Sequence, residues 1–160
     1  MKPRDPARTV SLRAAQTADR IAIGELLAAN RLPVAEAGGA PIRFWVAELA
    51  GQIIGTIALE SYADQGLLRS LCVDARVRGQ GIGQALVETV ETEAASAGIV
   101  RLVLLTETAE RFFTDLGYDA VDRATVAGAL RASPLFATLC PASAVCLGKT
   151  LHFHHAEPSP

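Results

Sequence analysis

The sequence predicts an α/β fold with a mixed sheet. An apolar strand pattern at 66–73, an amphipathic helix at 82–97 and a second apolar strand pattern at 100–106 follow one another, which implies a parallel pair with a right-handed crossover. Two strand patterns at 43–49 and 52–61 are separated only by an Ala-Gly dipeptide, which indicates an antiparallel hairpin. A sheet that contains both kinds of pair is mixed.

The other elements follow from the same kinds of signal. Residues 9–15 resemble a strand, and residues 17–30 have an apolar helical face with Thr17 at the N-cap position. Gly98 marks the end of the helix at 82–97. The remaining expected elements are a loop at 32–42, a helix at 109–117, a strand at 118–123, an irregular or helical insertion at 124–140 and a strand at 143–151.

Length and charge limit the class of protein. A chain of 160 residues suits one domain, expected at 9–151, with a disordered segment at 1–8 and a flexible tail at 152–160. The 15 basic and 17 acidic side chains give a net charge of −2, so no overall field attracts nucleic acid or anionic lipid. No stretch approaches the roughly 18 apolar residues of a membrane span, and the first residues lack an apolar leader pattern, which favours a cytoplasmic protein.

The stretch "RGQGIGQ" at 78–84 lies where a strand turns into a helix. The backbone N–H groups of a first helical turn have no intrahelical partner, and the helix dipole adds a partial positive charge there. Glycine lets a phosphate approach the backbone closely, and Arg78 adds a guanidinium suited to bidentate phosphate contacts. We therefore expect a pyrophosphate site, with a plain glycine-rich turn beside a solvated arginine as the alternative.

Two common phosphate-binding motifs do not fit this turn. The dinucleotide fingerprint needs Gly or Ala three residues after its second glycine, but Gln84 and Leu86 stand at those places. A P-loop needs Gly-Lys-Ser/Thr, and no lysine lies near the turn. The site must belong to another class.

The turn and a later segment together match a known pattern. Arg78, Gly81 and Gly83 form the spacing Arg-x-x-Gly-x-Gly after the fourth strand, and "TETAERFFTDLGY" at 106–118 contains a helix, an aromatic pair and a Gly-Tyr pair. Both segments resemble motifs of the GNAT superfamily of N-acyltransferases, and the resemblance extends over 10–151. It implies a mostly antiparallel mixed sheet with splayed central parallel strands flanked by helices, acetyl-CoA as co-substrate and no metal.

The resemblance also implies which residues contact acetyl-CoA. Pantetheine would insert between the splayed strands, and the glycine turn would hold the pyrophosphate. Thr106 stands where the family often has asparagine. The implied cofactor-binding residues are Leu71, Cys72, Val73, Arg78, Gly79, Gln80, Gly81, Ile82, Gly83, Thr106 and Phe113.

Within the superfamily, the segments "GLLRSLCV", "LLTETAERFF" and "LFATLCPASAVC" resemble the arsenic-resistance N-acetyltransferases. This resemblance implies a small primary amine as acceptor, such as an amino-acid-like toxin or an organoarsenical. Arg43, Arg69 and Arg131 are candidates to bind an anionic group of that substrate, with solvated surface arginines as the alternative. We expect the insertion, with Phe136 and Leu139 as an apolar wall, to lie over the acceptor end. A homodimer is one option.

Acyl transfer to an amine requires an unprotonated nitrogen, a polarised thioester carbonyl and a proton for the leaving thiolate. A backbone N–H near Val73 is the donor to the carbonyl that the family uses. Glu60 is the first candidate for the base, Glu107 the second and Glu48 the third, with a solvated charge at a strand end as the alternative for each.

The proton donor departs from the family pattern. Many relatives have a tyrosine facing the thiolate, but Phe113 stands at the matching position and cannot donate a proton. Tyr118 is interpreted as a core aromatic. Water, Cys72 or Ser70 would then protonate the thiolate, or the protein is a poor catalyst.

The three cysteines suggest a second class of function. Cys72, Cys140 and Cys146 match no zinc spacing and are expected to be free thiols. One hypothesis is that they converge on a thiophilic ion such as trivalent arsenic, and the other is that they are buried as small apolar side chains. The alternative to an enzyme is therefore a non-catalytic GNAT-fold protein that binds acyl-CoA or a metalloid.

Overall fold

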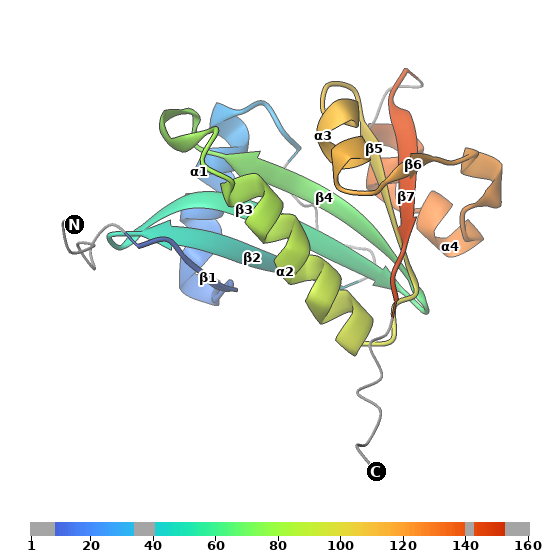
Figure 1. Cartoon of the computed structure of the whole chain (residues 1–160), viewed down its shortest axis with the longest axis horizontal. Helices are drawn as coiled ribbons and strands as arrows, with labels where there is room; N and C mark the ends of the chain where they lie inside the picture. The colour runs from blue at the N-terminus through green and yellow to red at the C-terminus, as the bar shows by residue number, and fades with distance from the viewer. Residues whose placement is uncertain (1–8, 34–40, 140–142, 153–160) are drawn as a thin grey trace, which may run out of the picture.

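Seven strands form one sheet in the computed structural model, which describes residues 9–33, 41–139 and 143–152. The strand order is β1-β2-β3-β4-β5-β7-β6 (Figure 1). The strands are Ser11–Ala14 (β1), Ile42–Leu49 (β2), Gln52–Tyr62 (β3), Gln65–Val73 (β4), Arg101–Thr106 (β5), Asp119–Ala120 (β6) and Val145–Thr150 (β7). Strands β4 and β5 pair in parallel, and the other neighbours pair antiparallel. The predicted mixed sheet is confirmed.

Helices cover both faces of this sheet. In Figure 1, α2 (Ile82–Ser96) crosses in front of the strands and α1 (Arg20–Ala29) lies behind them. Two shorter helices, α3 (Glu110–Asp115) and α4 (Gly128–Arg131), follow later in the chain. No helix within the described ranges has both the length and the apolar character needed to cross a membrane.

Alternation along the strands separates the two faces, because successive side chains of a strand point to opposite sides. Leu68 of β4 belongs to the large buried cluster beneath α2, which we call the α2-side cluster. Its neighbour Leu67 packs with Leu130 of α4 in a second cluster. A third cluster joins α1 to Val46 and Cys72. The face opposite α2 is therefore shared between α1 and the α4 segment.

The start of the first helix differs from the prediction. Thr17 is the first residue of a 3-10 turn at Thr17–Asp19 and not an N-cap. The capping role falls to Asp19, whose Oδ2 accepts the N–H of Gln16 at 2.7 Å. Asp19 is also bound by Arg13 of β1, so an ion pair to the preceding strand holds the carboxylate at the start of the helix.

The strand predicted at 118–123 is shorter than expected, because β6 has only two residues. Asp122 instead caps a 3-10 turn by accepting the N–H of Ala124 at 2.9 Å, which ends the extended conformation. The insertion that follows contains α4 and a π-helical turn at Leu135–Leu139, as the prediction of an irregular or helical segment required.

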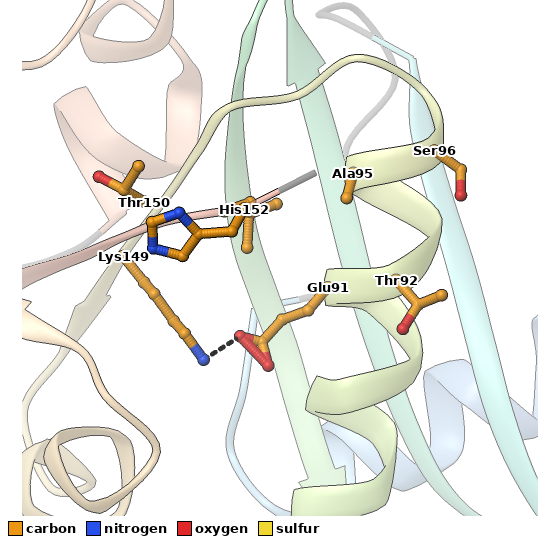
Figure 2. A pocket seen from close by; sticks show the side chains of 8 residues that line it. Glu91, Thr92, Ala95, Ser96, Lys149, Thr150 and His152 are labelled. Atoms are coloured by element: carbon orange, nitrogen blue, oxygen red, sulfur yellow. Dashed lines mark ion pairs between the residues drawn. The ribbon is translucent and has the colours of Figure 1, made fainter. Parts of the chain in front are cut away.

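The C-terminal half of α2 is tied to β7. Lys149 Nζ lies 2.7 Å from Glu91 Oε2, as Figure 2 shows, and donates to Leu116 O at 2.9 Å. The hydroxyl of Tyr118 also donates to Glu91 Oε2, at 3.3 Å. Burial and the Glu91 carboxylate raise the pKa of Tyr118. We call these three charged and polar residues, Glu91, Tyr118 and Lys149, the clasp. Glu91 and Lys149 border a hollow of about 500 Å³.

Candidate functional site

Strands β4 and β5 separate near their middle. Their parallel pairing covers three residue pairs and ends at Leu67↔Val103, while β4 continues to Val73. Ser70 has a positive φ of 58°, and the register with β3 shifts beside it, which is the pattern of a β-bulge. The end of β4 therefore has no β5 ladder partner, and its backbone groups on that side are available to a ligand.

Two glycines after β4 require a left-handed backbone. Gly79 and Gly81 both have a φ of 80°, which costs other L-residues roughly 1 kcal/mol or more. A Cβ on either residue would meet no heavy atom within 4 Å, so the space beside them is open. Gly83 differs, because its Cβ would lie 3.5 Å from the Phe112 ring. The first two glycines thus shape the backbone and leave room for a ligand.

The start of α2 presents unpaired donors. Gly81 is its N-cap and has no side chain to accept a hydrogen bond from the first turn. The N–H of Ala85 donates to Gly81 O at 3.0 Å. The N–H groups of Ile82, Gly83 and Gln84 precede that bond and lie in the unpaired first turn. Together with the helix dipole, these N–H groups suit an anion.

A groove of about 660 Å³ joins these parts. Most of the predicted cofactor-binding residues line it, namely Leu71, Cys72, Val73, Arg78, Gly79, Gly81, Ile82 and Gly83. Gln80 is exposed and does not line it, and Thr106 closes a turn by accepting the N–H of Ala109 at 2.9 Å. Asn30 and Phe112 line the groove although the sequence did not indicate them.

The aromatic pair of α3 divides between the groove and the core. Phe112 lines the groove, whereas Phe113 is buried and its ring meets that of Tyr118 edge-on at 5.4 Å. Consecutive helical residues point about 100° apart, so only one of them can face the groove. The structure therefore places Phe112, and not the predicted Phe113, at the wall of the groove. Tyr118 is fully buried, which confirms its interpretation as a core aromatic.

A buried charged cluster lies on the face opposite α2. Glu60 is 1% exposed; its Oε2 accepts from Arg69 Nη1 at 2.9 Å and its Oε1 from the Tyr62 hydroxyl at 2.7 Å. Burial, together with Glu60, raises the pKa of Tyr62 to about 12, and a hydrogen bond from Ser133 acts in the opposite direction. Both carboxylate oxygens of Glu60 are thus occupied, so a role as base would require one of these bonds to open.

Arg69 connects this cluster to the point where the strands separate. Its Nε lies 3.3 Å from Ser70 Oγ, at the bulge. Its Nη2 is buried and has no hydrogen-bond partner in the described part of the chain. Unpaired buried donors are rare in native proteins and call for a water or a ligand. Arg69 therefore has one buried donor that the described side chains around it leave unsatisfied.

Arg43 does not join Arg69 in a clamp. It is exposed, and its guanidinium carbon lies 4.8 Å from the centroid of the Trp45 ring. In the ladders, Arg43 is opposite Leu59 and Arg69 is opposite Ala58. Because adjacent residues of β3 point to opposite faces, the two arginines lie on different sides of the sheet.

The other predicted charged residues are separate from the cluster. Arg131 is exposed at the end of α4. Glu107 is exposed, and its Oε1 accepts from Ser143 Oγ at 3.1 Å. Glu48 is bound by Arg13 at 2.7 Å and so belongs to the structural ion pair at the start of α1.

The thiols of Cys72 and Cys146 do not converge. Cys72 packs beneath α1, with its Sγ 3.7 Å from Leu26 O, whereas Cys146 packs in the cluster beneath α4. Both are free and buried, and burial raises the pKa of each thiol. Their interpretation as small apolar side chains is confirmed, and Cys140 lies outside the described residues. Over the described ranges, no group of three or more His, Cys, Asp or Glu side chains is placed to hold a metal.

The family of the chain follows from its sequence. The profile described as "Acetyltransferase (GNAT) domain" matches residues 40–120, which is half of the chain and includes the glycine turn. The protein belongs to the GNAT acetyltransferase domain family.

Curated relatives match over part of their length. An amino-acid acetyltransferase of Mycobacterium tuberculosis is 29% identical over 120 residues, which cover 72% of this chain and 66% of the relative. N-acetyltransferase 8 of Mus musculus is 42% identical over 69 residues, which cover 39% of this chain and 30% of the mouse protein. The chain thus spans less than a third of the mouse relative.

Solved structures share the fold. The N-acetylglutamate synthase of Neisseria gonorrhoeae, complexed with coenzyme A and N-acetyl-glutamate, has a TM-score of 0.76 at 22% identity over 91% of this chain and 36% of that chain. A protein of Mycobacterium tuberculosis, in complex with CoA, has a TM-score of 0.72 at 24% identity over 89% of this chain and 99% of that chain. At these identities the likeness shows the fold alone, and the GNAT fold is confirmed.

Proposed function

We propose that the protein transfers the acetyl group of acetyl-CoA to the primary amine of a small molecule. The observation that carries this proposal is the groove. Its left-handed glycines, the unpaired first turn of α2 and Arg78 offer donors to a diphosphate. The separation of β4 from β5 offers backbone groups to a pantetheine arm. Membership of the GNAT family supports the same function.

The chemistry divides between the co-substrate and the chain. Acetyl-CoA supplies an activated thioester. A backbone N–H near Val73 would stabilise the negative charge that develops on the carbonyl oxygen. Glu60, directly or through water, would take the proton of the ammonium group, with Glu107 as the second candidate. No tyrosine is among the groove-lining residues that the structure describes, so water is the simplest proton donor for the thiolate.

The acceptor that we propose is amino-acid-like. The unpaired Nη2 of Arg69 is suited to a carboxylate or another oxyanion. The names of the relatives point to the same class, since one is an amino-acid acetyltransferase. An organoarsenical with an α-amino group is the specific candidate that the arsenic-resistance resemblance suggests. Arg131 and the buried Phe136 belong to the insertion that we propose to border this acceptor.

A thiol-release assay tests the proposal. Acetyl-CoA would be offered with amino acids, amino-acid analogues including an organoarsenical, polyamines and peptides. We expect CoA release with at least one small α-amino acid or analogue and none with peptides. If no acceptor in the panel causes CoA release and CoA does not bind, the enzymatic proposal is wrong.

Non-catalytic binding of acyl-CoA is the second candidate. It is favoured by Phe113, which lies in the core where many relatives have a proton-donating tyrosine. Calorimetry separates the two functions, because binding of CoA without thiol release from any acceptor would favour the second. A cytoplasmic location and a homodimer stay predictions from the sequence.

A further inference from the structure

Asn30 connects α1 to the glycine turn. It follows the last residue of α1, and its Nδ2 donates to Leu26 O at 2.8 Å, which fixes the orientation of the amide. Its Oδ1 then accepts from Arg78 Nη2 at 2.5 Å. Asn30 and Arg78 are 48 residues apart in the sequence, and both line the groove.

Two contacts hold the guanidinium of Arg78 from the same side. Nη2 donates to Asn30, and Nε donates to Val73 O at 3.2 Å. A guanidinium has five N–H donors in one plane, so these two bonds set the plane and leave the remaining donors for another partner. An exposed arginine otherwise loses side-chain entropy when a ligand immobilises it. A guanidinium that two hydrogen bonds already hold loses less side-chain entropy.

We propose that Asn30 is a positioning residue that holds Arg78 toward the diphosphate of acetyl-CoA. This inference rests on the proposed function, because it assumes that a diphosphate binds at the glycine turn. Asn30 is neutral and therefore orients the guanidinium without neutralising it, whereas an aspartate would compete with the phosphate. The opposite hypothesis is that the contact blocks Arg78 and must break when the ligand binds.

A double-mutant cycle on CoA affinity, measured by calorimetry, tests the proposal without an acceptor. The variants are Asn30→Ala, Arg78→Ala and the double variant. We expect Asn30→Ala to weaken CoA binding about fivefold and Arg78→Ala at least about tenfold. The double variant should bind like Arg78→Ala alone, because Asn30 acts only through that side chain.

A second probe and a control variant separate positioning from a structural role. Pantetheine lacks the diphosphate, so Asn30→Ala should leave its affinity unchanged. Glu25→Ala alters another polar side chain of α1 that is exposed, and it should leave CoA affinity unchanged.

Other results of these measurements would contradict the positioning role of Asn30 or the proposed function. If Asn30→Ala weakens CoA binding equally in the wild type and in Arg78→Ala, Asn30 acts independently of Arg78, by ending α1 or by contacts of its own in the groove, and the positioning role is wrong. Tighter binding by Asn30→Ala would show that the contact competes with the ligand. If the wild-type protein does not bind CoA, the proposed function itself fails, whatever the variants do.

Discussion

The two ends of α2 are completed in opposite ways. At the C-terminal end, the N–H groups of Gly98 and Ile99 donate to Ala95 O and Ala94 O at 3.1 and 3.0 Å, the bond pattern of a Schellman cap. The clasp ties the same half of the helix to β7. At the N-terminal end, Gly81 offers no capping side chain, and the first turn faces the groove.

This difference indicates which end serves the fold and which serves a ligand. The chain satisfies its own polar groups at the end that needs only stability. Gly98 and Gly81 both have a positive φ. At Gly81, however, the N–H groups of the first helical turn stay without a partner from the capping residue. An end that stays unpaired beside a groove is suited to bind an anion.

The largest expected effect comes from Gly81→Asp. A carboxylate at the N-cap would satisfy the first turn internally and repel a phosphate, so we expect CoA affinity to fall at least about 100-fold. The matched control is Gly98→Asp at the other end of α2. Its φ of 89° makes the strain similar, about 1 kcal/mol of stability, but CoA affinity should not change. Equal CoA affinity in folded Gly81→Asp and wild type would remove the basis of the proposed site.

Glu60→Gln should have the next largest effect. The side chains of Arg69 and Glu60 are 4% and 2% exposed, and breaking a buried pair costs about 3 kcal/mol because it leaves one charge uncompensated. We also expect turnover to fall most at low pH, where the acceptor amine is an ammonium ion.

A double variant separates stability from catalysis at Glu60. Arg69→Met in the Glu60→Gln background removes the orphaned charge and should restore much of the lost stability in urea unfolding. Catalysis is read from Glu60→Gln itself, because Arg69 is the proposed acceptor ligand; if its turnover at saturating acceptor has the wild-type pH profile, Glu60 is not the base and Glu107 becomes the candidate. The exposed Glu107→Gln serves as the stability control.

Tyr118→Phe should have a smaller effect and only on the clasp. It removes the hydroxyl that donates to Glu91 and leaves the packing of the ring against Phe113. We expect a loss of about 1 kcal/mol in unfolding free energy and unchanged CoA affinity. A change in CoA affinity would show that the two ends of α2 are coupled.

The smallest expected effect concerns the pH response of the 3-10 turn at Ala75–Val77, which Asp74 caps just before the glycine turn. Asp74 accepts the N–H of Arg76 at 2.9 Å, and hydrogen bonds from Arg76 lower the pKa of Asp74 from 3.8 to about 2. The folded pKa is below the unfolded value, so the stabilisation is fully present above about pH 4 and is lost as pH falls toward 2. Melting curves of wild type and Asp74→Ala should therefore converge toward pH 2. A difference that is as large at pH 2 as at pH 6 would contradict this.

Elements and the glycine turn were predictable because their signals are local. The apolar spacing of α2, its stop at Gly98 and the Ala-Gly hairpin connection each depend on a few neighbouring residues. That Thr17 is not the N-cap was not predictable from local spacing, since the carboxylate of Asp19 accepts the N–H of Gln16 and is paired with Arg13 of β1. The length of β6 likewise depended on Asp122, which forms a turn in place of a longer strand.

The sequence by itself determined the order of the strands and helices along the chain and the position of the glycine turn, because periodicity and backbone conformation are properties of short segments. The predicted residues that line the groove came from the resemblance to the GNAT motifs. Only the tertiary structure decided that Asn30 meets Arg78, that Arg43 and Arg69 lie on opposite faces, and that Cys72 and Cys146 stay apart. Each of these features relates residues that are far apart in the chain. Their relative positions are set by strand register and by the packing of helices on the two faces of the sheet, which no local pattern encodes.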